Sequence, residues 1–157
     1  MPFDFRTGVF AAVFCALPLA TALAGDPTGM WLTKGGKARV QVTDCGGALC
    51  GTIVWLKDPN DPATGHPKVD GNNADPKLRG RSLIGLQVVS GMHQVAGADK
   101  WTGSVYSIDR GKTYSGTLVL QSPTSLKVEG CFLAMCDGEV WTREAPNPGR
   151  GSAQRAR

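Results

Sequence analysis

The stretch "ARVQVTDCGGALCGTIVWL" (residues 38–56) decides the fold, because it holds two extended segments joined by a short turn between cysteines. Val40 and Val42 alternate with polar residues before the turn, and Ile53 and Trp55 alternate with other residues after it. A period of two is typical of a β-strand with one buried face. Two such segments joined by a short, glycine-containing loop predict an antiparallel hairpin.

The cysteine spacing C-x₄-C occurs twice, at Cys45 and Cys50 and again at Cys131 and Cys136. A four-residue hairpin loop places its flanking residues opposite each other, about 4.5–5.5 Å apart at Cα, which suits a disulfide. A zinc site with four cysteine ligands is the alternative. A redox site is disfavoured because C-x-x-C is absent. Four cysteines allow three connectivities, and we predict the bonds 45–50 and 131–136 as staples on two hairpin ends.

The N-terminal residues 1–24 have the anatomy of a secretory signal peptide. Arg6 precedes an apolar run from 8 to 23, and small residues precede a cleavage site near Ala24. The run is short for a membrane span, and the alternative is an uncleaved anchor. Cleavage removes Cys15 and leaves an even number of cysteines in an exported domain, which favours disulfides. We therefore expect a periplasmic or secreted protein with no membrane span in the mature chain.

The chain has a formal net charge of +4, and three of its arginines lie in the C-terminal stretch "PNPGRGSAQRAR" (146–157). This stretch is rich in Pro, Gly and Arg and has no apolar pattern, so it is predicted to be disordered. The rest is nearly neutral and has no basic groove with interleaved aromatic residues, which argues against nucleic acid as a partner. The expected organisation is a signal peptide over 1–24, a β-barrel domain over 25–144 and a disordered tail over 145–157.

The mature chain consists of extended segments separated by turn residues, with no apolar period long enough for a confident helix. The fold class is therefore all-β. Eight strands joined mainly by short turns predict an antiparallel up-and-down barrel, because eight strands close a small barrel. A β-sandwich is the alternative. The expected strands cover residues 28–33, 37–45, 50–56, 83–89, 100–108, 113–121, 125–131 and 136–142.

Several sequence blocks resemble a family of exported bacterial proteins that is catalogued as a domain of unknown function and has a lipocalin-like (calycin-type) barrel. The blocks are "GMW", "CGGALCGTIVW", "DGNNADPKLRGRSLIGL", "WTGSVYSIDRGKTYSG" and "GCFLAMCDGEVWTR", and they span residues 29–143. This resemblance implies that the chain folds as such a barrel and is exported. It does not imply a particular reaction, because none is established for the family.

The pair Gly29-x-Trp31 also resembles the first strand of lipocalins and avidins. In those proteins the tryptophan lies on the barrel floor, beneath a basic residue from the end of the last strand. The resemblance implies the same structural role for Trp31 and Arg143, with a cation–π contact between them.

Few residues point to catalysis. The chain has two histidines, His66 and His93, and shows no Ser-His-Asp order or nucleophile elbow. Glu129 and Glu139 are a candidate pair of carboxylates of the kind that glycosidases use. The alternative is that both are charged residues facing water. We expect a protein that is not an enzyme and that uses no cofactor or metal ion.

The segment "KDPNDPATGHPKVDGNNADPKLRGRS" (57–82) is longer than an ordinary connector, which is typical of a functional loop or lid. Arg79 and Arg81 point the same way in an extended segment, so we predict that they clamp an anion or a ligand carboxylate. The alternative is structural: the arginines bind Asp70 or Asp75 and tie the loop to the barrel rim.

A calcium site in the same segment is a third interpretation, with the oxygen ligands Asp70, Asn72, Asn73 and Asp75. The EF-hand pattern argues against it, because that pattern needs Gly and Glu where this chain has Asp75 and Arg81.

The barrel interior is the other candidate site, because an eight-stranded barrel is either filled by side chains or holds one small ligand. Small residues at Gly51, Gly103 and Gly116 beside aromatic residues predict an aromatic-walled space. The alternative is that the aromatic side chains fill the core. With the two loop arginines included, the predicted ligand-binding residues are Trp55, Arg79, Arg81, Trp101, Tyr106 and Tyr114.

The stapled turn "FLAM" (132–135) carries only apolar residues. If exposed, it predicts contact with a partner or a membrane; if folded inward, it plugs the barrel end. The leading function is non-catalytic binding of a small apolar or amphiphilic ligand. The alternative is an envelope protein-interaction module, inhibitor or chaperone-like, that uses the loops at the barrel end. A deep apolar cavity favours the first function, and a filled barrel with an exposed tip favours the second.

Overall fold

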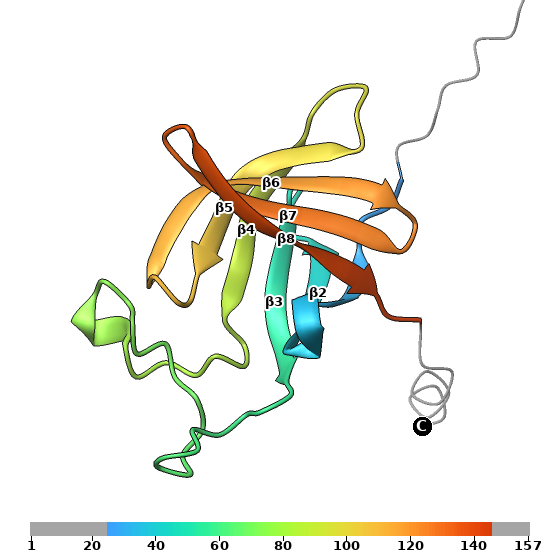
Figure 1. Cartoon of the computed structure of the whole chain (residues 1–157). Coiled ribbons are helices and arrows are strands. Elements are labelled where there is room, and N and C mark those ends of the chain that lie inside the picture. The colour runs from blue at the N-terminus through green and yellow to red at the C-terminus, as the bar shows by residue number, and fades with distance from the viewer. Residues whose placement is uncertain (1–24, 146–157) are drawn as a thin grey trace, which may run out of the picture.

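The computed structural model describes residues 25–145, which form a closed barrel of eight antiparallel strands in chain order (Figure 1). The last strand pairs with the first through Trp31 and Arg143, and this pairing closes the barrel. The predicted up-and-down barrel is confirmed, and the sandwich alternative is wrong. The predicted signal peptide lies outside the described residues, and so do residues 146–157 of the predicted tail.

The elements are β1 (Gly29–Leu32), η1 (Lys34–Gly36), β2 (Ala38–Asp44), β3 (Leu49–Leu56), η2 (Pro76–Leu78), β4 (Gln87–Gln94), β5 (Lys100–Ser107), β6 (Lys112–Ser122), β7 (Ser125–Phe132) and β8 (Met135–Arg143). The two η elements are single turns of 3₁₀ helix. Within the described residues, no helix has the length and apolar character needed to cross a membrane.

Alternation along the strands sorts side chains into an inward apolar set and an outward polar set. In β6, for example, Gly116, Leu118 and Leu120 are buried, whereas Ser115 and Gln121 are exposed. The inward residues of all eight strands form one apolar core, whose tryptophans are Trp31, Trp101 and Trp141. Burying a large apolar side chain stabilises a fold by roughly 1.5–3 kcal/mol, so this core is what holds the barrel together.

The fourth strand differs from its predicted position over 83–89, because β4 covers Gln87–Gln94. Leu83 and Leu86 are still buried, which explains the apolar pattern in that region of the sequence. The backbone turns at Gly85, where φ is +92°, a conformation that favours glycine. The residues before β4 therefore pack into the core from an irregular segment and not from a strand.

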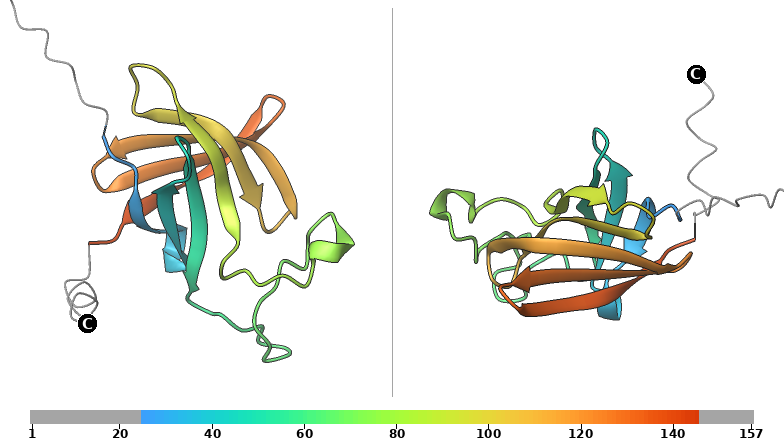
Figure 2. Two further views of the ribbon diagram at one scale, coloured as in Figure 1. Left: turned by 180° about the vertical axis from the view of Figure 1, so that it is seen from behind. Right: turned by 90° about the horizontal axis from the view of Figure 1, so that it is seen from above.

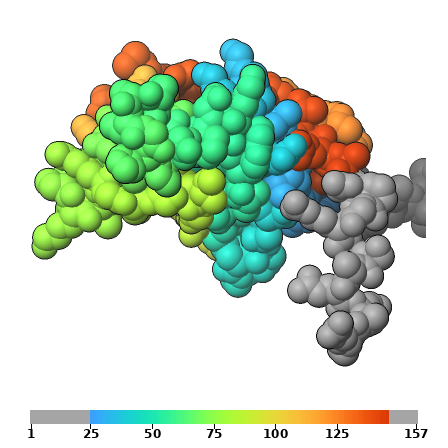
Figure 3. All heavy atoms as spheres, turned by 90° about the horizontal axis from the view of Figure 1, so that it is seen from below, coloured from blue at the N-terminus to red at the C-terminus, as the bar shows by residue number. Residues whose placement is uncertain are grey.

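The two ends of the barrel are built differently (Figure 2). The connections 45–48, 95–99 and 123–124 lie at one end, which we call the floor. The opposite end, the mouth, carries η1, the long segment 57–86, the turn 108–111 and the tip of the β7–β8 hairpin. In the space-filling view from below, the long segment is green and lies directly against the barrel (Figure 3).

Each end carries one disulfide bond, and both predicted cysteine pairs are bonded. Cys45 and Cys50 bridge the β2–β3 connection at the floor, with their Cα atoms 5.9 Å apart. Cys131 and Cys136 are direct partners in the β7–β8 ladder at the mouth, with their Cα atoms 4.0 Å apart. Beyond this second bond the β7–β8 ladder has one more pair, Phe132 with Met135, so the turn at the tip of the hairpin has two residues.

The floor is closed by Trp31, which is fully buried. Its indole N–H donates to the carbonyl oxygen of Pro27 at 2.8 Å. The guanidinium carbon of Arg143 lies 4.3 Å from the centre of the indole ring. The same guanidinium donates to the carbonyl oxygens of Asp26 and Thr28, which precede β1. Arg143 therefore joins the end of the last strand to the residues that lead into the first.

Candidate functional site

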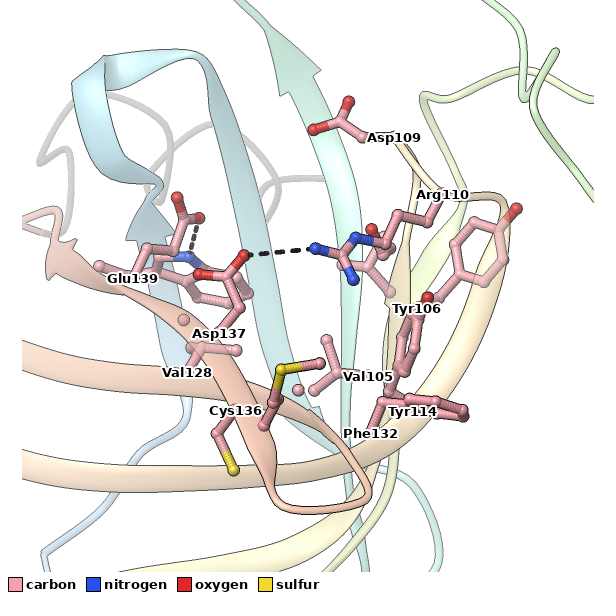
Figure 4. Close-up of a pocket in the computed structure, with 16 residues that line it drawn as sticks. Val105, Tyr106, Asp109, Arg110, Tyr114, Val128, Phe132, Cys136, Asp137 and Glu139 are labelled. Carbon is pink, nitrogen blue, oxygen red and sulfur yellow. Dashed lines mark hydrogen bonds and ion pairs between the residues drawn. The ribbon is translucent and has the colours of Figure 1, made fainter.

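A cavity of about 590 Å³ lies at the barrel mouth (Figure 4). Its apolar wall includes Val105, Val128 and Trp141, which come from β5, β7 and β8. An aromatic pair, Tyr114 and Phe132, forms another wall, with ring centres 6.3 Å apart in an edge-to-face arrangement. The cavity is therefore lined by core-type apolar side chains from five neighbouring strands, β4 to β8.

A glycine on the inward face of β7 helps to keep this space open. Gly130 follows Leu126 and Val128 in the alternating series that faces the interior, and it lines the cavity. A Cβ atom added at Gly130 would lie 3.5 Å from the Cβ atom of Tyr114, an ordinary contact distance. A larger side chain at this position would therefore occupy the cavity without displacing the backbone.

Charged side chains surround the opening of the cavity. Asp109 and Arg110 come from the β5–β6 turn, and Asp137 and Glu139 come from the start of β8. Arg110 and Asp137 point toward each other, with nitrogen and oxygen 4.0 Å apart (Figure 4). A carboxylate oxygen of Glu139 accepts a hydrogen bond from the indole N–H of Trp141 at 2.5 Å. These four side chains place three carboxylates against one guanidinium.

The candidate carboxylate pair Glu129 and Glu139 does not share a face of the sheet. Glu139 is the ladder partner of Val128, which faces the core, whereas Glu129 is one residue further along β7. Glu129 forms an ion pair with Lys127 at 2.7 Å, on the other face of that strand. Glu139 lies two residues before Trp141 in β8, so both side chains face the interior. This spacing is the signal in the sequence that identifies Glu139 as a cavity residue.

The long segment is fixed to the barrel by a buried carboxylate. Asp70 is fully buried and accepts hydrogen bonds from the hydroxyl of Tyr106 at 2.7 Å and from the side-chain amide of Asn73 at 2.7 Å. Arg81 forms an ion pair with the same carboxylate at 2.8 Å. Since Tyr106 belongs to β5, this network joins the segment to the barrel wall.

Hydrogen bonding sets the charge state of this network. Burial alone would raise the pKa of Asp70, but the hydrogen bonds from Asn73, Tyr106 and Arg81 and the charge of Arg81 outweigh it, so the pKa lies below its usual value. The pKa of Tyr106 is raised, first by burial and then by its bond to Asp70. Asp70 is therefore ionised at neutral pH, and Tyr106 keeps the proton that it donates.

Both arginines that were predicted to clamp a ligand contact the segment itself. Arg81 binds Asp70, and its guanidinium carbon lies 5.3 Å from the ring centre of Tyr106. Arg79 donates to the backbone oxygen of Asn73 at 2.8 Å. The side chain of Asn73 in turn accepts from the amide of Asp75 at 2.8 Å. These contacts are the ones expected from the alternative in which the arginines hold the loop in place.

The four predicted aromatic residues separate into three environments. Tyr106 and Tyr114 line the mouth cavity. Trp101 is 5% exposed and belongs to the core. Trp55 lies beside Arg39, with the guanidinium carbon 4.3 Å from the ring centre, because the β2–β3 register shifts next to Arg39 and interrupts the alternation along the strands.

Among residues 25–145, no three His, Cys, Asp or Glu side chains are grouped so that they could hold a metal ion. In the segment that suggested calcium, both carboxylate oxygens of Asp70 already accept hydrogen bonds from protein groups. The two disulfide bonds fit a protein that works outside the cytoplasm.

A closed eight-stranded barrel, with a cavity at one end and a tryptophan beneath an arginine at the other, is a lipocalin-like fold. The chain belongs to the bacterial family described as "Uncharacterized protein conserved in bacteria (DUF2147)", whose sequence profile matches residues 29–143. The resemblance to a bacterial family of unknown function is therefore confirmed. A comparison with curated proteins found no match.

One solved structure is similar over most of the barrel. It is described as "Protein HP1028 from the human pathogen Helicobacter pylori belongs to the lipocalin family". The two chains are 22% identical, with a TM-score of 0.64, and the likeness covers 77% of this chain and 84% of the other. At this level of identity the likeness establishes the shared fold.

Proposed function

We propose that this protein binds a small amphiphilic molecule in the mouth cavity and does not transform it. One observation carries the proposal: a cavity of about 590 Å³ has an apolar wall and a charged opening. Ligand sites are typically concave spaces of roughly 300–1,000 Å³ with mostly apolar walls and a few polar groups that orient the ligand. The cavity matches this description in size and in composition.

The lining also indicates which end of the ligand lies where. An apolar tail would contact Val105, Val128 and Trp141, where it removes apolar surface from water at roughly 25 cal/mol per Å². The polar head would lie at the opening, close to Asp137 and Glu139. Because three carboxylates face one guanidinium there, the favoured head carries a positive charge or several N–H donors.

The role of Tyr106 supports binding without catalysis. Tyr106 lines the cavity, and burial and its bond to Asp70 raise its pKa. Its hydroxyl donates to Asp70, so it is held in a structural contact.

We also propose that the chain is exported through the predicted signal peptide over 1–24 and acts in the periplasm or outside the cell, which the two disulfide bonds support.

Two measurements test this function. The first is native mass spectrometry of the protein purified from its own cell envelope, in which we expect an adduct of the mass of a small molecule. The second is calorimetric titration with monomeric dodecyltrimethylammonium, dodecyl maltoside and dodecyl sulfate. We expect the cationic probe to bind most tightly and the sulfate least.

A matched pair of variants localises the binding. Gly130→Val adds a branched side chain on the inward face of β7, so it narrows the cavity and should weaken binding of all three probes. Val140→Thr changes a β8 residue that is 44% exposed and lies outside the cavity lining, so it should bind like the unchanged protein. Equal binding by Gly130→Val and the unchanged protein, or no binding by the unchanged protein, would overturn the proposed function.

A further inference from the structure

The β7–β8 hairpin ends in four apolar residues that the fold leaves in solvent. The exposed fraction is 59% for Phe132, 89% for Leu133 and 77% for Met135, and Ala134 completes the turn. The tip projects clear of the neighbouring segments in Figure 1 and in the left view of Figure 2. Of the two alternatives for this tip, the structure shows the exposed one, because the tip points away from the core and does not plug the barrel end.

The tip is also an unusual place for leucine. Leu133 has φ of +55°, and it is the one non-glycine residue with positive φ among the described residues. Glycine or asparagine is favoured in this conformation, and other residues adopt it at an energetic cost. The leucine side chain gains no burial in return, so neither the turn nor the core accounts for its presence.

The tip belongs to the same apolar surface as the cavity. Phe132 and Met135 contribute both to the exposed tip and to the cavity lining. An apolar path therefore leads from the end of the hairpin into the site. The disulfide between Cys131 and Cys136 holds the two strands together directly behind the tip.

The size and chemistry of the tip decide between a protein and a lipid bilayer as its partner. A stable protein interface needs about 800 Å² from each partner, which is far more than a two-residue turn and its flanking pair provide. The side chains of residues 132–135 have no charge and no hydrogen-bonding group apart from a thioether, so they offer little for a protein to recognise specifically. A bilayer needs only apolar area, because its interior dissolves such side chains.

Charged residues near the tip are mixed in sign. Arg110 and Lys112 are exposed there together with Asp109 and Asp137. This balance offers no strong attraction to an anionic surface, so any association should depend on apolar insertion and only slightly on lipid charge.

We propose that the β7–β8 tip inserts into the apolar region of a lipid bilayer and brings the cavity mouth to the membrane surface. A membrane-derived amphiphile then passes along Phe132 and Met135 into the cavity. This transfer step rests on the proposed ligand-binding function, whereas the docking step depends on the tip alone.

Vesicle flotation of the purified protein tests the docking, with phosphatidylcholine vesicles and with vesicles that also contain phosphatidylglycerol. The test variant is Leu133→Asn with Met135→Gln. Asparagine suits the positive φ at Leu133, so this variant should fold at least as well, which thermal unfolding checks. The control is Val95→Asn, a residue that is 38% exposed at the floor end.

We expect the unchanged protein to float with both kinds of vesicle. The tip variant should bind at least about tenfold more weakly, the effect of one large apolar side chain, and Val95→Asn should bind within about twofold of the unchanged protein, since a surface residue away from the contact has little effect. Gly130→Val, which narrows the cavity, should bind its amphiphile probes more weakly and still float, which separates failure of the ligand proposal from failure of docking.

Three outcomes would overturn the docking proposal. The unchanged protein fails to float, or the tip variant floats equally well, or binding requires phosphatidylglycerol and disappears at high salt. Sedimentation analysis tests whether the partner of the tip is a second copy of the chain. A dimer that forms at the same concentrations and is lost in the tip variant would assign the tip to self-association instead.

Discussion

Replacing Asp70 by asparagine should destabilise the protein by an amount that the contacts of Asp70 define. The carboxylate is 0% exposed and accepts from Tyr106, Asn73 and Arg81. Breaking a buried charged pair by removing one partner costs about 3–5 kcal/mol. The Arg81 side chain is 37% exposed and regains water, so we reduce this figure to about 2–3 kcal/mol. For a domain of this size, that corresponds to a fall in melting temperature of roughly 8–12 °C.

The pH dependence follows from the direction of the pKa shift. The pKa of Asp70 is lowered from 3.8 in the folded protein. Its contribution to stability is therefore complete above pH ~4 and is lost as the pH falls through the lower, folded value. Thermal unfolding between pH 7 and pH 2 should show this acid loss in the unchanged protein and a smaller loss in Asp70→Asn.

The control for this experiment is Asp58→Asn, which removes an exposed carboxylate from the same segment. Its melting temperature should change by less than about 2 °C, as expected for a surface substitution. Hydrogen exchange gives a second measurement, because the amide of Asp70 donates to the Arg81 carbonyl and that of Ala74 to the Gly111 carbonyl. If Asp70→Asn alters neither the melting temperature nor the exchange of these amides, the network does not hold the segment and our reasoning fails.

Three further predictions concern the floor, the tip and the opening. Trp31→Ala should cost about 3–5 kcal/mol in unfolding free energy, and a double-mutant cycle with Arg143→Ala should give a coupling of roughly 0.5–2 kcal/mol; a coupling of zero would contradict the floor contact. Removing the mouth staple with Cys131→Ala and Cys136→Ala should cost about 2 kcal/mol in denaturant unfolding, whereas an unchanged midpoint would show that the ladder alone fixes the hairpin. Glu139→Gln should weaken the cationic probe by about tenfold, the effect of one charge-assisted contact, and leave dodecyl maltoside within about twofold; equal losses for both probes would mean that Glu139 shapes the cavity without reading charge.

Most of the fold could be predicted from the sequence because its determinants are local. Alternation of apolar residues identifies strands wherever the ladder is regular, and turn residues between them give the meander order that closes into a barrel. The cysteine pairs could be predicted for the same reason, since each joins residues close in sequence within one hairpin. Only β4 was misplaced, because Leu83 and Leu86 are buried from an irregular segment that turns at Gly85.

The candidate site was harder to predict because it depends on contacts between distant residues. Trp55 follows the alternation of Ile53 in the sequence, but the register shift in β2–β3 brings it to Arg39. The sequence places two acidic residues close enough to Arg81 to be its ion-pair partner. No local pattern in the sequence indicates that Tyr106 of β5 contacts Asp70, which is 36 residues away. Glu139 could have been identified from its spacing to Trp141, if the inward face of β8 had been followed to the mouth.

The division of the barrel into floor and mouth explains how one small domain can combine stability with an open site. The last and first strands are joined at the floor by the Trp31 and Arg143 contacts, so closure of the barrel does not depend on side chains at the mouth. Tyr106 is the exception, because it lines the cavity and also holds Asp70 in the long segment. The segment therefore positions one wall of the site. Substitutions such as Gly130→Val should change binding with little effect on stability, whereas Asp70→Asn should change both, since it releases the segment and the tyrosine together.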